Sequence, residues 1–193
     1  MSAFKPRTRD GNFLFSVILT TAKMLFIVVL ILGITGTGLL VGVAKAWIET
    51  APELDLSSFN EQAKTSFIYD KYGTLITDFK GTENRIDATW QEIPDNLKNA
   101  VIAVEDQRFR THNGVDIKRI MGALVTNLLN DNVQGGSTIL QQLVKLTMLN
   151  ADQNYKRKLQ EAYLALQLEK QISKDDILLE YLNIIFLGGN DYG

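Results

Sequence analysis

An uninterrupted apolar run is the first feature of the chain. The 21 residues from Met24 to Ala44 carry no charge. At about 1.5 Å per residue, a helix of that length spans roughly 31 Å, the thickness of a bilayer core. The apolar segment of a secretory signal peptide is usually shorter, about 7–15 residues. The run therefore predicts a transmembrane helix over 24–44, while Ala44-Lys45-Ala46 resembles an A-x-A cleavage site and leaves a signal peptide as the alternative.

Short β-rich segments follow the apolar run. Residues 45–63 are expected to form a linker that leads off the membrane. The segments SFIYD and TLITDF, within Ser66–Phe79, then favour a small hairpin around the turn Lys71-Tyr72-Gly73.

Beyond the hairpin the apolar spacing becomes helical. Pro94 suits a helix start, and apolar residues recur after it at Leu97, Ala100, Val101 and Val104. A second helix is expected over 117–129, capped by Asp116 and carrying a wide apolar stripe.

Three further helices are expected towards the end of the chain. Ser137 or Thr138 is the expected cap of the first of them, and the next covers roughly 153–172. Ser173 followed by Asp176 resembles a capping box for the last helix, which is expected to end at Gly188-Gly189. The part after the apolar run is therefore predicted to be mainly α, with a small β element at its entrance.

The charges are distributed unevenly about the apolar run. Residues 1–23 carry a net charge of +3, whereas the whole chain of 193 residues carries −2. The positive-inside rule then places the N-terminus in the cytoplasm and residues 45–193 outside. The weak overall charge argues against nucleic-acid binding. The absence of cysteine excludes disulfides and thiolate metal sites, and a single histidine excludes a histidine-rich metal site.

Two residues near the end of the first expected helix are candidates for chemistry. Glu105 ends an apolar helical run, where partial desolvation would raise the pKa of its carboxyl and suit a general base. The alternative is the polar edge of an amphipathic helix. For His112 a structural role is expected, as a hydrogen-bonding partner that fixes the turn Thr111–Gly114.

The segment QGGSTILQQ is more informative. Two glycines ahead of a Ser-Thr cap leave backbone N–H groups at a helix N-terminus, which is a ready site for an anion such as phosphate. Gln141 and Gln142 add amide donors, and Lys145 lies on about the same face. An ordinary Gly-Gly turn with a helix cap is the alternative.

A second cluster of charges lies on the following helix. Arg157 and Lys158 precede Glu161 at helical spacing, which places an arginine and a carboxylate on one face. Taken alone, such a pair is more typical of a surface ion pair than of a site.

The order of these segments resembles a known family. The chain contains EDQRFRTHNG from Glu105, GGSTILQQ from Gly135, RKLQE from Arg157 and KDDILLEYLN from Lys174. This order is similar to four of the five usual motifs of the family 51 peptidoglycan glycosyltransferases, found in class A penicillin-binding proteins and monofunctional transglycosylases. The resemblance runs from about Ser66 to the end of the chain.

The resemblance implies a fold, a reaction and a location. The fold is lysozyme-like and mainly α. The organisation is a cytoplasmic basic tail, a transmembrane helix, a linker and an extracytoplasmic glycosyltransferase domain, at 1–23, 24–44, 45–63 and 64–193. The reaction polymerises lipid II: the 4-hydroxyl of a new lipid II attacks the anomeric carbon of a lipid-linked glycan strand. Undecaprenyl pyrophosphate leaves, with inversion to a β-1,4 link. The partners implied are these two substrates, the bacterial cytoplasmic membrane and cell-wall assembly proteins.

The same resemblance implies roles for individual residues. Glu105 is the base, and Glu161 is a second carboxylate near the pyrophosphate or its divalent cation, Mg²⁺ or Mn²⁺. Further residues would bind the substrate and its pyrophosphate: Ser137, Thr138, Gln141, Gln142, Lys145, Arg157 and Lys158. The supporting residues would be Asp106, Phe109, His112, Gly114, Gly135, Gly136, Tyr181 and Asn183.

Some features depart from the family pattern or leave alternatives open. Leu140 and Leu146 stand where the second motif usually has Thr and Asn, and are expected to remove polar groups from the cleft. The stripe on 117–129 suits either ordinary core or a surface that touches lipid or covers the cleft. The chain ends just after the fourth motif, so a truncated domain with little activity of its own is expected. The alternatives to polymerisation are a lytic transglycosylase and a catalytically silent, membrane-anchored partner in a cell-wall assembly complex.

Overall fold

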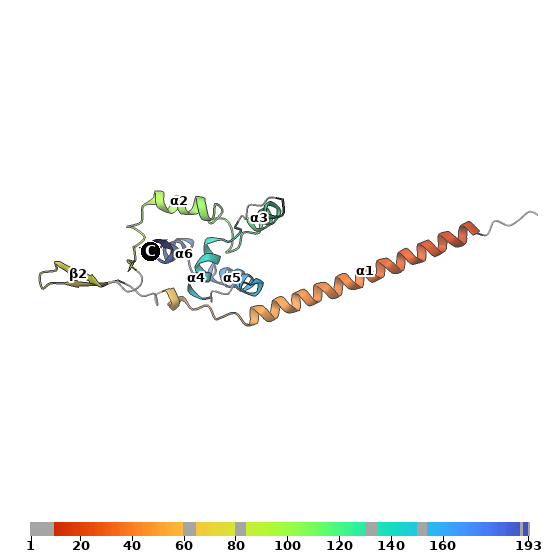
Figure 1. Cartoon of the computed structure of the whole chain (residues 1–193), viewed down its shortest axis with the longest axis horizontal. Helices are drawn as coiled ribbons and strands as arrows, with labels where there is room; N and C mark the ends of the chain where they lie inside the picture. Colours follow the sequence, from red (N-terminus) through yellow and green to blue (C-terminus); the bar gives the residue numbers. More distant parts are fainter. Residues whose placement is uncertain are drawn as a thin grey trace, which may run out of the picture. The chain divides into compact units, whose positions relative to one another are not determined.

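The computed structural model describes residues 10–59, 65–79, 84–129, 135–149, 154–189 and 191–192. The chain divides into two units, residues 1–46 and 47–193, and each is described by itself. Figure 1 shows the order of their elements.

The apolar run lies within one long helix, α1, Asp10–Glu49. Its part from Phe13 to Glu49 is long and apolar enough to cross a membrane. The helix extends beyond the expected span of 24–44 at both ends, because no proline interrupts the flanking residues. The expected linker therefore begins as the end of α1 and continues into a short 3₁₀ turn, Leu56–Phe59.

The predicted hairpin is confirmed. Strands β1, Ser66–Tyr69, and β2, Leu75–Phe79, pair antiparallel. The Asp70 carboxylate accepts hydrogen bonds of 2.8 Å from the backbone N–H groups of Tyr72 and Thr74, which closes the turn between the strands.

A second, smaller sheet joins distant parts of the chain. Its strands are β3, Asn84–Arg85, β4, Phe186–Gly188, and β5, Asp191–Tyr192, in the order β3-β5-β4. Strand β3 is parallel to β5, and β4 is antiparallel to β5.

Five further helices follow α1, so the mainly α prediction is confirmed. They are α2, Asp95–Glu105, α3, Ile117–Leu129, α4, Ile139–Thr147, α5, Tyr155–Leu168, and α6, Lys174–Ile184. The expected caps are in place: Pro94 precedes α2, Asp116 accepts the Arg119 N–H at 3.0 Å, and Thr138 and Ser173 cap α4 and α6.

The core lies where α4, α5 and α6 pack together (Figure 1). Each helix contributes fully buried aliphatic side chains, and Phe109 joins them from the loop after α2. Burying one large apolar side chain contributes about 1.5–3 kcal/mol. Leu140 of α4 is among these core residues, with no exposed surface. Its departure from the family pattern therefore alters the core and not the cleft.

The apolar stripe of α3 is not core. Ala123 is its one buried residue, whereas its large apolar side chains are exposed: Ile117, Ile120, Met121, Leu124, Val125, Leu128 and Leu129. The structure thus rejects the core interpretation of this helix and leaves an apolar surface.

Two helix ends differ from the sequence-based expectation. Helix α5 ends at Leu168, and helix α6 ends at Ile184 instead of continuing to Gly188. The buried Arg85 guanidinium donates hydrogen bonds to the Asn183 and Ile184 carbonyls, at 2.9 and 3.5 Å, and thereby caps α6. The residues that follow form β4 instead of another helical turn.

Candidate active site

Glu105, the last residue of α2, lies next to α4. The Gln142 side-chain Nε2 donates a 2.9 Å hydrogen bond to Glu105 Oε2. The Tyr181 hydroxyl of α6 in turn donates to Gln142 Oε1, at 3.0 Å. Because this second bond occupies the amide oxygen, the amide nitrogen is directed at the carboxylate. Three helices thus hold Glu105 as a hydrogen-bond acceptor.

Tyr181 remains a phenol in this arrangement. Its side chain is 4% exposed. Burial, followed by the negative charge of Glu105, raises the pKa of Tyr181 to about 12. The hydroxyl therefore keeps its proton at neutral pH and serves as the donor to Gln142. The structure thus brings together Glu105, Gln142 and Tyr181, three residues that the sequence had assigned to one site.

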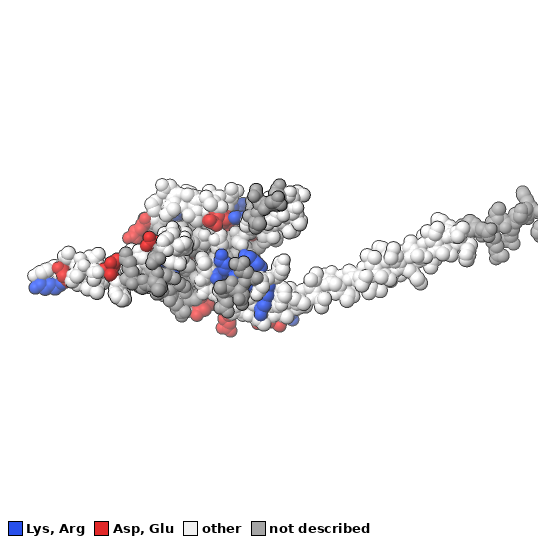
Figure 2. All heavy atoms as spheres, in the orientation of Figure 1, with Lys and Arg blue, Asp and Glu red and all other residues white. Residues whose placement is uncertain are grey.

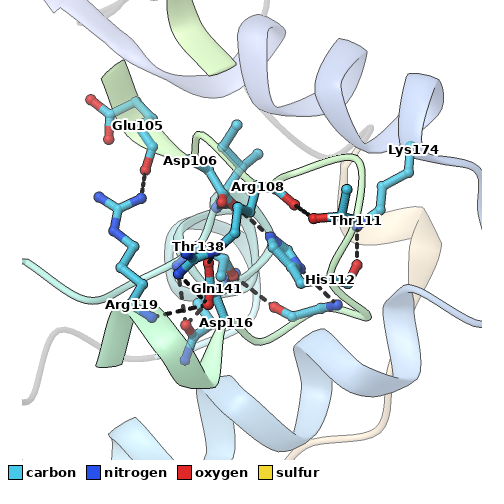
Figure 3. A network of polar contacts seen from close by, with 12 residues as sticks. Glu105, Asp106, Arg108, Thr111, His112, Asp116, Arg119, Thr138, Gln141 and Lys174 are labelled. Carbon is cyan, nitrogen blue, oxygen red and sulfur yellow. Dashed lines mark hydrogen bonds and ion pairs between the residues drawn. The ribbon is translucent and has the colours of Figure 1, made fainter. Parts of the chain in front are cut away.

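Asp106 fixes the segment that follows Glu105. Its buried Oδ2 accepts hydrogen bonds from His112 Nε2 at 2.8 Å and from the backbone N–H of Ile139 at 3.1 Å (Figure 3). The Ile139 N–H belongs to the first turn of α4, where a negative charge interacts favourably with the helix dipole. Asp106 therefore joins the end of α2 to the start of α4.

His112 makes the predicted turn-fixing hydrogen bond. Its Nδ1 accepts the Gly114 N–H at 3.1 Å, so Nε2 carries the proton that points at Asp106. Gly114 has a φ of +91°, and a Cβ at this position would lie 2.6 Å from the Ala165 carbonyl oxygen. Only glycine fits this contact between the motif and α5 without displacement. Phe109 lies beneath this loop in the core.

Three backbone N–H groups at the N-terminus of α4, those of Thr138, Ile139 and Gln141, already bond protein groups. The Thr138 hydroxyl donates to the Gly114 carbonyl at 2.7 Å and accepts the Gln141 N–H at 3.2 Å. The Gln141 side-chain oxygen accepts the Thr138 N–H at 3.1 Å, which completes a capping box, and Ile139 donates to Asp106. These donors are not available to a phosphate. The interpretation of this turn as a capped helix start therefore fits better than a backbone anion site, and Thr138 and Gln141 act as structural groups.

A second cluster surrounds Glu161 on α5. Its side chain has no exposed surface, and Lys158 Nζ donates to Oε2 at 2.5 Å. Arg157 Nε lies 3.1 Å from Oε1, an ion-pair distance. Lys158 Nζ also donates to the Ser137 hydroxyl at 3.1 Å. The Arg157–Glu161 pair considered from the sequence is present, but it is not a surface pair, because the Glu161 carboxylate that faces Arg157 and Lys158 is fully buried.

The two clusters contact the same short segment of chain. Ser137 precedes α4 and belongs to the Glu161 cluster, while Gln142 belongs to the Glu105 cluster. Lys145 lies almost one turn beyond Gln142, and among the described residues nothing is bonded to its ammonium group.

A cavity of about 490 Å³ lies at the start of α5. Arg157 lines it and also approaches Glu161, so the cavity borders the second cluster. Lys156, Gln160, Met148 and Leu149 line other parts of it. Figure 2 shows Lys and Arg gathered on the face where Figure 1 draws α5. The combination of cations and apolar side chains suits an anionic group attached to a lipid.

Other predicted site residues lie away from these clusters. The Asn183 side chain bonds the backbone of Ala88 through both its amide nitrogen and its oxygen, at 3.0 and 2.9 Å, and so holds the segment before α2. Gly135 and Gly136 form the loop before Ser137, and Gly136 runs against α3 at Ile120. Leu146 is exposed on α4.

Sequence reasoning did not assign Arg108, Asp116 and Arg119 to the site. Arg108 and Asp116 form a two-point ion pair with distances of 2.7 and 2.8 Å. The hydrogen bond from Arg108 lowers the pKa of Asp116 to about 2. Arg119 donates to the Glu105 backbone carbonyl (Figure 3) and, at 3.3 Å, to the Gly135 carbonyl. The one sequence signal for a role of Arg119 is its position within the predicted helix 117–129, which otherwise carries an apolar stripe.

The residues around Glu161 offer a divalent cation a single carboxylate. Within the described ranges no three His, Asp or Glu side chains gather closely enough to hold a metal. Mg²⁺ is often bound through one or two carboxylates together with substrate phosphates. Glu161, whose oxygens face Arg157 and Lys158, is the one carboxylate of this cluster that could serve as a protein ligand to such a cation.

Comparisons with known proteins agree with the sequence resemblance. A family model described as Transglycosylase matches residues 72–193. Penicillin-binding protein 1A of Clostridium perfringens is 43% identical over 176 residues, which cover 89% of this chain and 26% of that protein. Penicillin-binding protein 1A/1B of Bacillus subtilis is 42% identical over 190 residues, which cover 98% of this chain and 20% of that protein. The chain thus spans about a quarter or less of the length of these relatives.

Proposed function

Because the chain belongs to the transglycosylase family, we propose that it polymerises lipid II into β-1,4-linked glycan strands. The main support for this proposal is the presence of two clusters, one around Glu105 and one around Glu161, that both contact α4 or the residue just before it. Within the described residues the Glu105 carboxylate accepts a hydrogen bond from the neutral Gln142 amide, whereas Glu161 is held by the cations Arg157 and Lys158. The first suits proton abstraction, and the second suits a pyrophosphate leaving group.

Glu105 is the general base of the proposed reaction. Its carboxylate takes the proton from the 4-hydroxyl of the acceptor lipid II, and the oxygen forms a bond with the anomeric carbon of the donor strand. Gln142 and Tyr181 hold the carboxylate in place, since the buried Tyr181 phenol keeps its proton. A positioned base of this kind contributes about 10²–10⁴ to the rate.

The leaving group is stabilised by the second cluster. As the bond between the anomeric carbon and the pyrophosphate oxygen breaks, the electron pair stays with undecaprenyl pyrophosphate. Arg157 and Lys158 of this cluster, together with Lys145 from α4, supply the positive charge for that product by charge-assisted hydrogen bonds. Attack and departure on opposite faces of the sugar give inversion.

Glu161 is the residue that would hold a divalent cation beside the pyrophosphate. Mg²⁺ or Mn²⁺ supplies charge neutralisation when it is bound, and Glu161 is the side chain that would hold it. The two cations that now face Glu161 would then turn towards the phosphate oxygens.

The membrane part of the proposal concerns α1 and α3. Helix α1 spans the cytoplasmic membrane with its N-terminus inside, because the positive charges precede the apolar run. The exposed apolar stripe of α3 contacts the outer lipid surface, from which the lipid-linked substrates come.

A lytic transglycosylase is the rival enzyme, and it needs no binding site for pyrophosphate. The cations around the buried Glu161 favour polymerisation, because cleavage of a finished glycan strand releases no anion there. A catalytically silent partner would not need Glu105 to be held by hydrogen bonds that join three helices.

The test is to reconstitute the natural gene product in liposomes with labelled lipid II and Mg²⁺. We expect a ladder of glycan strands and the release of one undecaprenyl pyrophosphate for each bond formed. In a parallel sample, purified glycan strands should keep their length. Shortening of those strands would favour the lytic enzyme, and no reaction in either sample would favour the silent partner.

A further inference from the structure

Arg119 connects three segments that surround the candidate active site. It lies on α3, near the start of the helix. Its Nη1 donates to the backbone carbonyl of Glu105, and its Nε donates to the carbonyl of Gly135 at 3.3 Å. The Glu105 carbonyl is in the last turn of α2, where helix carbonyls lack partners within the helix. The Gly135 carbonyl belongs to the loop that leads to Ser137.

The loop before α4 also rests on α3 directly. A Cβ on Gly136 would lie 3.4 Å from the Ile120 Cα, so the loop backbone runs against the helix next to Arg119. Arg119 itself is held at its own backbone, since its N–H donates to Asp116 at 3.0 Å, and Asp116 is fixed by Arg108. The guanidinium therefore extends from a rigid helix start (Figure 3).

The two hydrogen bonds from Arg119 link the two clusters. Glu105 carries the base of the proposed function, while Ser137 contacts Lys158 and so belongs to the pyrophosphate end. We propose that Arg119 is a positioning residue that fixes the distance between the base and the leaving-group cluster by holding Glu105 and the Gly135–Ser137 loop together. This inference rests on the proposed function and extends it to a residue outside the four motifs.

The planar guanidinium is required for this role. It presents donors in a fixed fork and can serve two carbonyl groups at once. A lysine at this position offers a single ammonium centre, which can hold one of the two carbonyls well. A methionine of similar length removes both bonds and leaves two carbonyls without that partner.

The experiment compares the natural gene product with Arg119→Lys and Arg119→Met in lipid II polymerisation. Arg110→Met is the matched control, because Arg110 is an exposed arginine that pairs with Asp175 on the surface. We expect kcat to fall about tenfold or more in Arg119→Met and less in Arg119→Lys, with KM for lipid II within twofold of wild type. We expect Arg110→Met to keep the wild-type kcat.

Hydrogen exchange supplies a readout that is independent of activity. Amides of residues 135–138 should exchange faster in Arg119→Met than in wild type or in Arg110→Met. If Arg119→Met does not fold, Arg119→Lys decides, by the same two measurements.

Several results would overturn the positioning role. They are a folded Arg119 variant with wild-type kcat and exchange, a rise in KM without a fall in kcat, and a fall in kcat that Arg110→Met shares. An inactive wild type would overturn the proposed function and with it the contribution of Arg119 to that reaction. In that case the exchange measurement still shows whether Arg119 holds the loop.

Discussion

Gln142 donates a 2.9 Å hydrogen bond to Glu105 from a position 37 residues later in the chain. The amide has one orientation because the Tyr181 hydroxyl occupies its oxygen. Glu105 is therefore held as an acceptor by a donor that carries no charge.

The contact of Gly114 with α5 predicts a loss of stability on substitution. In Gly114→Ala the Cβ would meet the Ala165 carbonyl oxygen at 2.6 Å, and the φ of +91° is unfavourable for alanine. We expect the free energy of unfolding to fall by about 1–3 kcal/mol. Thermal unfolding of the protein in detergent checks this.

The matched control is Gly122→Ala. Gly122 lies within α3, and a Cβ there meets nothing within 4 Å. Alanine is favoured over glycine in a helix by about 1 kcal/mol, so this variant should unfold at the same temperature or higher. A Gly114→Ala protein as stable as Gly122→Ala would contradict the close approach.

The ion pair of Asp116 with Arg108 predicts a defined pH dependence. The pKa of Asp116 is lowered from 3.8 to about 2, chiefly by the hydrogen bond from Arg108. A depressed pKa in the folded protein means that this stabilisation is present above pH 4 and is lost as the pH falls through 2. It amounts to roughly 1–2 kcal/mol, because Arg108 is partly exposed and water screens the pair.

Asp116→Asn should therefore be less stable than wild type at pH 7. The difference between the two proteins should shrink between pH 4 and pH 2, as measured by thermal unfolding across that range. Asp175→Asn, which alters an exposed pair, is the control and should change stability little at any pH. A wild-type advantage over Asp116→Asn that stayed constant down to pH 2 would show that the pair does not act through the carboxylate charge.

The exposed stripe of α3 predicts contact with lipid. The chain has no cysteine, so a single substitution carries a label without competition. Leu128 is 76% exposed, and a polarity-sensitive dye on Leu128→Cys should report an apolar environment in liposomes and be quenched by brominated lipids. Tyr72→Cys, in the turn of the hairpin, should report water. Equal, water-like emission from both positions would contradict the lipid contact proposed for α3.

The orientation of α1 can be read with the same label site. A membrane-impermeant maleimide should label Tyr72→Cys in intact spheroplasts, because residues after the apolar run are proposed to lie outside. Ser2→Cys should be labelled only after the membrane is opened. The reverse pattern would require the opposite topology.

The family and the starts of the helices were predictable from the sequence, for different reasons. Four ordered motifs predict the transglycosylase family, which is confirmed. The caps at Thr138 and Ser173 are local features, since each side chain bonds an N–H a few residues later. The hairpin is equally local, because Asp70 closes the turn within its own segment.

The remaining features depend on contacts between distant residues. The end of α6 is set by Arg85, about 100 residues earlier, so no local signal marks it. The periodicity of 117–129 predicts an apolar face but not whether other helices cover it. The Gly-Gly turn resembled an anion site, yet Asp106 occupies a donor there from another segment. Arg119 could not be assigned to the site from the sequence, because its partners are backbone carbonyls of distant residues, which have no sequence signature.

The rate of lipid II polymerisation by Glu105→Gln is the most direct test of Glu105 as the general base. Glutamine keeps the shape of the side chain and can still accept the hydrogen bond from Gln142, so the fold should be retained. Glu92→Gln, at an exposed carboxylate that accepts hydrogen bonds from Thr89, serves as the control and should keep the wild-type rate. We expect Glu105→Gln to lower kcat by about 10²–10⁴ with an unchanged unfolding temperature. A Glu105→Gln protein that polymerises lipid II within a few fold of wild type would contradict the assignment of Glu105 as the base.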